Sequence, residues 1–192
     1  MKKTRFIIVT EIKSREIINL LKDLYTSLDI KYYNDLLLIT YNESFDQPIE
    51  EIIETINIDF GTSIHVHEGF ILNKNFNNNF LNEYITFVKE NNLLKQQYTN
   101  LTDIFYLIRK SNARDILNDY YIYILKPLIE KEDNRLIIET YFNNNMNVLK
   151  TSKVLYMNRN SLTKRLETMS KVIGYNIQTF KVASLVLFLM KI

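Results

Sequence analysis

The sequence predicts an α+β fold, with a small antiparallel sheet domain at the amino-terminal end and helices in the remainder. Apolar and β-branched residues form short strand-like runs within residues 1–72, and from residue 73 onward they recur at helical spacing. The chain has 192 residues, 46% of them hydrophobic, which is enough to bury a core. Its apolar runs are far shorter than the roughly 18 residues of a membrane-spanning helix.

The first half of the sheet domain is predicted as a strand, a helix and a hairpin. Residues 5–11 are an apolar, β-branched run typical of a strand. A helix is expected over 14–28, because Ser14 is a good N-cap and the apolar side chains that follow share one helical face. Residues 29–41 hold two β-prone runs around the dipeptide Asn34-Asp35, which predicts a tight hairpin.

A second helix and a last strand complete this domain. Pro48 opens a helix over 48–57, whose isoleucines share one face, and residues 62–67 are expected to form the strand. The resulting order is β-α-β-β-α-β, the ferredoxin-like arrangement, in which two helices cover one face of an antiparallel sheet. The predicted domain spans residues 1–72.

Residues 73–192 are predicted to be helical to the end. They divide into a helical middle region, 73–130, and a C-terminal unit, 131–192. Helices are expected over 78–94, 99–110, 113–128, 133–143, 147–155, 159–173 and 180–190.

The C-terminal unit contains two short helices joined by a tight break, the arrangement of a helix-turn-helix. Asn147 is expected to cap the first helix, and Asn158 the second by accepting a hydrogen bond from the amide of Ser161. Gly174 suits the left-handed residue that ends the second helix. The residues expected to face inward are Val148, Ser152 and Leu155 on the first helix, and Leu162, Leu166, Met169 and Ile173 on the second.

The outer face of these helices has the chemistry of a DNA reader. Arginine pairs bidentately with guanine and asparagine with adenine in the major groove, so we expect base readout by Arg159, Asn160 and Thr163. Arg165 falls off that face and is expected to serve phosphates or an intramolecular ion pair. The full set expected to contact phosphates or support the contact is Lys150, Thr151, Lys153, Tyr156, Ser161, Lys164 and Arg165.

Charge is distributed unevenly along the chain. The net charge is +2, but residues 147–192 carry eight Lys or Arg and only Glu167 as an acid, so this segment has a net charge of +7 and the rest −5. Clustered cations gain free energy by releasing the counterions condensed on phosphates, which indicates a polyanion partner. A solvated charged face is the alternative that charge alone leaves open.

From Ile138 to Leu187 the sequence resembles the C-terminal helix-turn-helix domain of the PucR/CdaR family of bacterial transcription regulators. The family pattern runs approximately G-N-x-S-x-T-A-x-x-L-x-x-H-R-N-T-L-x-Y-R-L, and residues 146–166 follow it without a gap. Residues 125–129 resemble the family's upstream L-x-P-L run. The pattern's alanine, histidine and tyrosine are replaced here by Ser152, Asn158 and Lys164. The resemblance implies a DNA-binding transcription regulator, with the exchange at residue 164 altering one contact.

Family members often carry a GGDEF-like domain, a sheet related to that of nucleotide cyclases, and the predicted order of residues 5–67 is similar to it. In this chain the corresponding hairpin is Tyr32-Tyr33-Asn34-Asp35-Leu36-Leu37. Both glycines are missing and the second acid is Leu36, so the close backbone approach to a phosphate and the metal-binding carboxylates are largely absent. Cyclase activity is not expected.

Other residue groups offer weaker signals. His65 and His67 share one face of the predicted last strand, but no third ligand accompanies them, so a solvated face is preferred over a metal site. The acids of 50–54 are interpreted as a solvated helix face. We expect core or dimer packing rather than a ligand pocket for Phe105, Tyr106, Tyr120, Tyr121 and Tyr123.

These observations favour a cytoplasmic, sequence-specific transcription regulator that binds double-stranded DNA as a homodimer and uses no cofactor. The absence of cysteine and of an export signal fits the cytoplasm. No nucleophile motif, phosphate loop or metalloprotease motif indicates an enzyme. Two alternatives stay open: a regulator whose helix-turn-helix is a docking surface for a protein, and a front domain that senses an unidentified small-molecule effector.

Overall fold

The computed structural model describes residues 4–10, 12–25, 27–33, 35–42, 48–72, 78–110, 114–131 and 133–191. The fold is mixed α+β, with a five-stranded sheet and a helical C-terminal region. The chain divides into two compact units, Met1–Ser111 and Asn112–Ile192. Within the described ranges, no helix is both long enough and apolar enough to cross a membrane.

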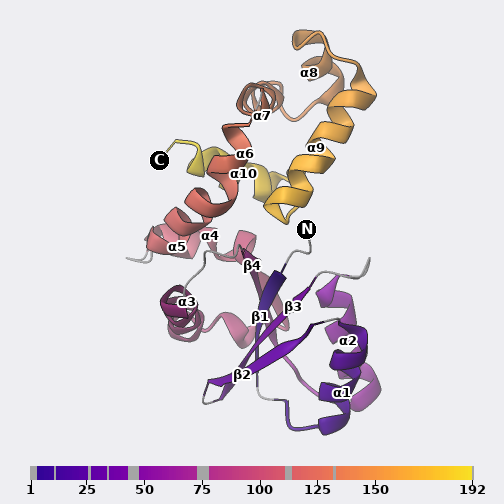
Figure 1. The fold of residues 1–192 in the computed structure, drawn as a ribbon, viewed down its shortest axis with the longest axis vertical. Coiled ribbons are helices and arrows are strands. Elements are labelled where there is room, and N and C mark those ends of the chain that lie inside the picture. The colour runs from indigo at the N-terminus through magenta and orange to yellow at the C-terminus, as the bar shows by residue number, and fades with distance from the viewer. Residues whose placement is uncertain are drawn as a thin grey trace. The chain divides into compact units, whose positions relative to one another are not determined.

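The first unit holds the sheet, whose strand order is β2-β3-β1-β4-β5. The first four strands are labelled in Figure 1. Neighbouring strands are antiparallel except for β4 and β5, which run parallel. The sequence did not predict β5, because a strand of three residues carries no periodic signal. The elements of this unit are β1 (Thr4–Thr10), α1 (Arg15–Leu24), β2 (Asp29–Tyr33), β3 (Leu36–Asn42), α2 (Ile49–Phe60), β4 (Val66–Leu72), α3 (Asn78–Glu90), η1 (Leu93–Lys95), β5 (Tyr98–Asn100) and α4 (Leu101–Lys110).

The start of the first unit follows the predicted order. Ser14 caps α1, since its hydroxyl accepts a hydrogen bond from the Ile17 amide. Strands β2 and β3 form the expected hairpin, with Tyr33 paired to Leu36 across a two-residue connection; Asn34 lies outside the described residues.

The predicted strand over 62–67 is misplaced, because β4 begins only at Val66. The amide side chain of Asn57 holds the preceding loop: its Oδ1 accepts from the Ile64 amide at 2.7 Å and its Nδ2 donates to the Ile64 carbonyl at 2.9 Å. These bonds occupy the backbone groups of Ile64 that a strand ladder would use. Gly61, with a φ of 59°, ends α2 and turns the chain into this loop.

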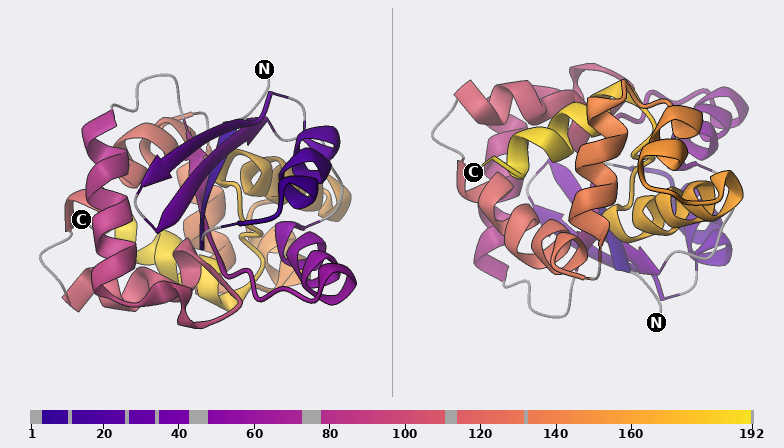
Figure 2. Two further views of the ribbon diagram at one scale, coloured as in Figure 1. Left: turned by 90° about the horizontal axis from the view of Figure 1, so that it is seen from below. Right: turned by 90° about the horizontal axis from the view of Figure 1, so that it is seen from above.

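Helices cover both faces of the sheet (Figure 2). Helices α1 and α2 pack on one face, over alternate residues such as Ile7 and Val9 of β1. On the other face Tyr84 of α3 meets Phe6 edge to face, with ring centroids 5.2 Å apart. Gly69 is required beside this cluster, since a Cβ there would lie 2.0 Å from Cζ of Phe6. The sequence predicted this helix, over 78–94, but assigned it to the helical middle region and not to the second face of the sheet.

The second unit is entirely helical within the described residues 114–131 and 133–191. Its core is the inward stripe of α9 together with α10, and the Tyr120 hydroxyl donates to the Ile173 carbonyl at 3.0 Å. The elements are α5 (Arg114–Tyr120), η2 (Tyr121–Leu125), α6 (Lys126–Ile129), α7 (Asn134–Asn143), α8 (Val148–Val154), α9 (Arg159–Ile173) and α10 (Phe180–Leu189).

The helix predicted over 113–128 widens into a π-helical turn, η2, before α6. The amide of Lys126 donates to the carbonyl of Tyr121, five residues earlier. Pro127 follows directly, has no amide hydrogen, and in a regular α-helix would clash with the carbonyl four residues before it. The wider turn accommodates the proline without ending the helical path.

Candidate nucleic-acid interface

The turn between α7 and α8 fixes where the helix-turn-helix begins. The amide of Met146 donates to the Tyr141 carbonyl at 2.9 Å, which closes the end of α7. Asn145 and Met146 both have left-handed backbones, with φ of 55° and 59°. Asn147 then caps α8, because its Oδ1 accepts from the Lys150 amide at 3.0 Å.

The turn between α8 and α9 is equally tight. The Met157 amide donates to the Ser152 carbonyl at 2.9 Å, and Tyr156 takes the left-handed position at φ 51°. This is the Schellman pattern, in which glycine is the usual residue. Asn158 caps α9 by accepting from the Asn160 amide at 2.8 Å, not from the Ser161 amide that the sequence suggested, because the side chain closes a shorter turn.

The inner side of α8 differs from the sequence prediction. Thr151 is 0% exposed, and its hydroxyl donates to the Asn147 carbonyl at 2.8 Å. The predicted phosphate contact by Thr151 is therefore wrong, because its side chain is buried and its hydroxyl is bonded within α8. Ser152 is buried as expected, whereas Val148 and Leu155 are only half-buried.

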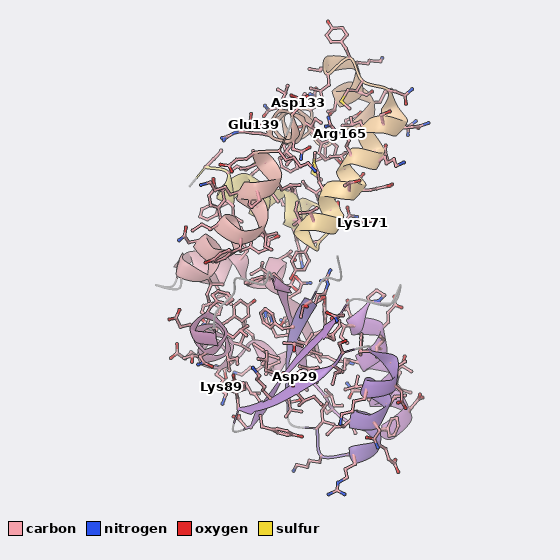
Figure 3. All side chains as sticks on the ribbon, in the orientation of Figure 1. Asp29, Lys89, Asp133, Glu139, Arg165 and Lys171 are labelled. Carbon is pink, nitrogen blue, oxygen red and sulfur yellow. The ribbon has the colours of Figure 1, made fainter. Side chains whose placement is uncertain are left out.

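Most of the predicted contact residues of the helix pair are exposed. Figure 3 shows side chains projecting outward from α8 and α9. Thr163 and Arg165 are half-buried, and the Thr163 hydroxyl donates to the Arg159 carbonyl at 3.1 Å. The Tyr156 side chain is 97% exposed, so its ring gains no packing energy from this left-handed position. The exposed members of the set are Lys150, Lys153, Tyr156, Arg159, Asn160, Ser161 and Lys164.

Helix α9 is anchored by its opposite face. The predicted stripe is buried throughout, and Gly174 ends the helix with a φ of 86°. From residue 140 to residue 166, all of which are described, the chain carries five Lys or Arg and no Asp or Glu. The exposed polar side chains of this stretch are therefore cations together with short amides and hydroxyls.

The histidines do not form the solvated face that the sequence suggested. His67 is fully buried between Thr99 and Tyr84, whose hydroxyl oxygens lie 2.8 Å from its Nδ1 and 2.9 Å from its Nε2. Burial lowers the pKa of His67 to about 3, so the ring is neutral at physiological pH. His65 lies in the loop before β4, and the described residues contain no group of three or more potential metal ligands.

The acids of α2 are exposed as expected, whereas the aromatic residues between 105 and 123 differ in burial. Glu50, Glu51 and Glu54 are exposed on α2 above buried isoleucines. Tyr120 belongs to the core, Phe105, Tyr121 and Tyr123 are half-buried, and the side chain of Tyr106 lies outside the described residues.

The sequence analysis did not predict two features of the site. No local sequence signal indicates the left-handed backbone at Tyr156. At Met146 a signal existed, because the family pattern has glycine at this position, and glycine often marks a positive φ. Lys131, in the turn between α6 and α7, also approaches α9, and only tertiary packing brings it there.

Comparison with known proteins connects this geometry to a family. Residues 136–192 match the model of the PucR C-terminal helix-turn-helix domain. A comparison with curated proteins finds no match. Among solved structures, the crystal structure of a regulator of polyketide synthase expression from Bifidobacterium adolescentis is similar, with 13% identity and a TM-score of 0.51 over 99% of this chain and 79% of that chain. At this identity the likeness shows the fold alone.

Proposed function

We propose that this chain is a sequence-specific DNA-binding transcription regulator, with α9 as its recognition helix. The observation that carries the proposal is the capped helix pair α8 and α9, within the segment that matches a helix-turn-helix domain. Its solvent face combines cations with short polar side chains and has no acid between residues 140 and 166. Such a face suits the phosphates and base edges of the major groove.

The residues divide into two roles. Arg159 and Asn160, exposed in the first turn of α9, are proposed to bind base edges, and Thr163 to contact a base or its sugar from the next turn. The proposed phosphate contacts fix the position of the protein without reading sequence. They are Lys150, Lys153, Tyr156, Ser161, Lys164 and Arg165.

Tyr156 supports an interaction role on energetic grounds. A left-handed backbone costs roughly 1–2 kcal/mol for a residue with a Cβ. The ring is 97% exposed and gains no packing in return. An exposed aromatic side chain on a strained backbone therefore favours a role for Tyr156 in contacting a partner.

We propose a helical middle region, 73–130, and a helix-turn-helix domain, 131–192, as the parts of the chain that follow the sheet domain. For residues 1–72 we infer a degenerate GGDEF-like domain with ferredoxin-like topology. The order β2-β3-β1-β4 of its first four strands supports this inference. Asp35, the remaining hairpin acid, is bound by Lys89 at 2.5 Å, and this hydrogen bond lowers its pKa. We expect no cyclase activity and a cytoplasmic location.

A second candidate function is protein docking through the helix-turn-helix. Leu149 and Val154 of α8 are 53% and 56% exposed, more than a purely polar DNA surface requires. If the purified chain shows no salt-sensitive binding to DNA, protein docking is the favoured function. A front domain that senses a small molecule predicts instead a thermal shift with that compound.

The test of the main proposal is DNA selection followed by affinity measurement. Double-stranded oligonucleotides bound by the full chain are sequenced, and the selected site is titrated at several salt concentrations. Arg159→Ala should weaken binding about 10- to 100-fold and relax base preference at one position.

The matched control is Arg135→Ala, on α7, whose guanidinium is exposed and bonded to Glu139. Removing it should leave affinity unchanged, because surface ion pairs contribute little. If Arg159→Ala keeps the affinity and base preference of the unaltered chain while circular dichroism shows an intact fold, the assignment of α9 is wrong.

A further inference from the structure

A groove lined by three cations and by the apolar side chains of Leu128, Met169 and Val172 runs along one flank of α9 within the second unit. Its volume is about 400 Å³, and its two walls are α9 and the turn between α6 and α7. Figure 3 labels Arg165 on the side of α9 that faces α7, and this side chain lines the groove. The groove extends from Ser161, in the first turn of α9, toward the end of the helix.

The charges of the groove come from both walls. Lys164 and Arg165 contribute from α9 and Lys131 from the opposite turn, and no acid occurs among the described residues that line it. Lys131 and Lys164 are exposed, so their ammonium groups remain available to an incoming anion. Thr168 adds a hydroxyl to the α9 wall.

Lys131 stands on a backbone held in place by hydrogen bonds. The Asn134 side chain, 8% exposed, donates from Nδ2 to the Leu128 carbonyl at 2.9 Å. The Asn134 amide donates to the Lys131 carbonyl, and the Lys131 amide to the Leu128 carbonyl, both at 3.3 Å. The turn is therefore closed on both sides of Lys131, which makes its position relative to α9 part of the fold.

We propose that this groove binds a backbone phosphate of the DNA strand next to the bases contacted by α9, and that Lys131 is a phosphate-binding residue. The inference rests on the proposed DNA-binding function. Lys164 belongs both to the groove and to the exposed face that carries Asn160, so the two surfaces are continuous. Cations on two walls suit a phosphate at the edge of the contacted bases.

The experiment measures DNA affinity against salt for the full chain and for Lys131→Ala. Loss of one phosphate contact should weaken binding to every sequence alike and make the slope of log K against log salt less steep by about 0.9. Base preference should stay that of the unaltered chain, in contrast to Arg159→Ala. Lys131→Glu should weaken binding further.

Lys126→Ala is the matched control, because Lys126 is an exposed lysine of α6 that does not line the groove. It should keep the affinity and the slope of the unaltered chain. If the unaltered chain binds a selected site and Lys131→Ala has the same slope, the groove inference fails while the proposed function stands. If the unaltered chain binds no DNA, both fail.

A free anion is the competing occupant, and a separate titration tests it. Inorganic phosphate is added to the DNA-free chain while amide NMR signals of Lys131 and Asn134 are followed. Saturable millimolar binding that Lys131→Ala abolishes, together with an unchanged DNA salt slope, would overturn the inference in favour of a small-molecule site.

Discussion

Tyr156 and Met146 place side chains where the backbone favours glycine. Both have a positive φ, 51° and 59°, at the two turns that flank α8. Met146 also stands where the family pattern has glycine. Main-chain hydrogen bonds close each turn and hold these residues at a positive φ. The backbone strain therefore persists, because the chain cannot adopt a more favourable φ without breaking those bonds.

Replacing Tyr156 by glycine separates strain from function. Tyr156→Gly should raise the free energy of unfolding by up to about 1 kcal/mol, because glycine has no Cβ penalty at this φ and the exposed ring loses no packing. DNA affinity should fall at the same time. Urea unfolding followed by circular dichroism measures the first effect; a lower midpoint for the variant would contradict the assigned strain.

His67 should make stability depend on pH between about 3 and 6.5. Its pKa is about 3 in the folded chain and about 6.5 when unfolded, so the unfolded chain binds more protons in this range. Stability is therefore fully present above pH 6.5 and decreases as pH falls, by ~2 kcal/mol at pH 5. Urea unfolding at pH 7 and pH 5 checks this.

The control for this pH dependence is His67→Gln, which keeps hydrogen-bonding capacity between Thr99 and Tyr84 but does not titrate. Its stability should change much less between pH 7 and pH 5, even if the variant is less stable at both. An equal loss in the variant and the unaltered chain would assign the effect to other groups.

At the scale of elements, local signals predicted best where both ends of a helix carry their own chemistry. Helix α9 has the predicted bounds of 159–173, because Asn158 caps its start and Gly174 ends it. Helix α3 ends at Glu90 and not at 94, since Asn92 turns left-handed at φ 52°. Neither its composition nor its periodicity distinguishes that asparagine from its neighbours.

Tertiary contacts account for what the sequence could not predict. The loop before β4 depends on a side chain of α2, Asn57, seven residues before its partner. The burial of Thr151 depends on the elements that pack against α8, and a threonine on a helix looks the same in sequence whether it faces solvent or a neighbour. The position of Lys131 beside α9 likewise follows from packing of α6 and α7 and from no local pattern.

At the scale of the molecule, the proposed interface of one chain is small. The outward first turns of a single recognition helix touch only a few base pairs, which limits both affinity and specificity. Two chains related by a two-fold axis would double the contacts and the released counterions. We therefore propose that the active form on DNA is a homodimer and that the operator contains two half-sites.

The spacing of those half-sites is the prediction that tests the dimer. Two recognition helices on one side of B-DNA require half-site centres about one helical turn, or 10–10.5 base pairs, apart or a multiple of it. Inserting about 5 base pairs between the half-sites of the selected operator moves one half-site to the opposite side of the duplex. Affinity should then fall to that of a single half-site, and an insertion of a full turn should restore part of it.

Gel-shift titrations with these operators, together with the mass of the complex by light scattering, provide the measurement. A cooperative transition and a mass of two chains per operator are expected on the original site, whereas the half-turn insertion should give independent, weaker binding. Equal affinity for the operator and for an isolated half-site would mean that one chain suffices, because no contact then depends on the spacing between two recognition helices.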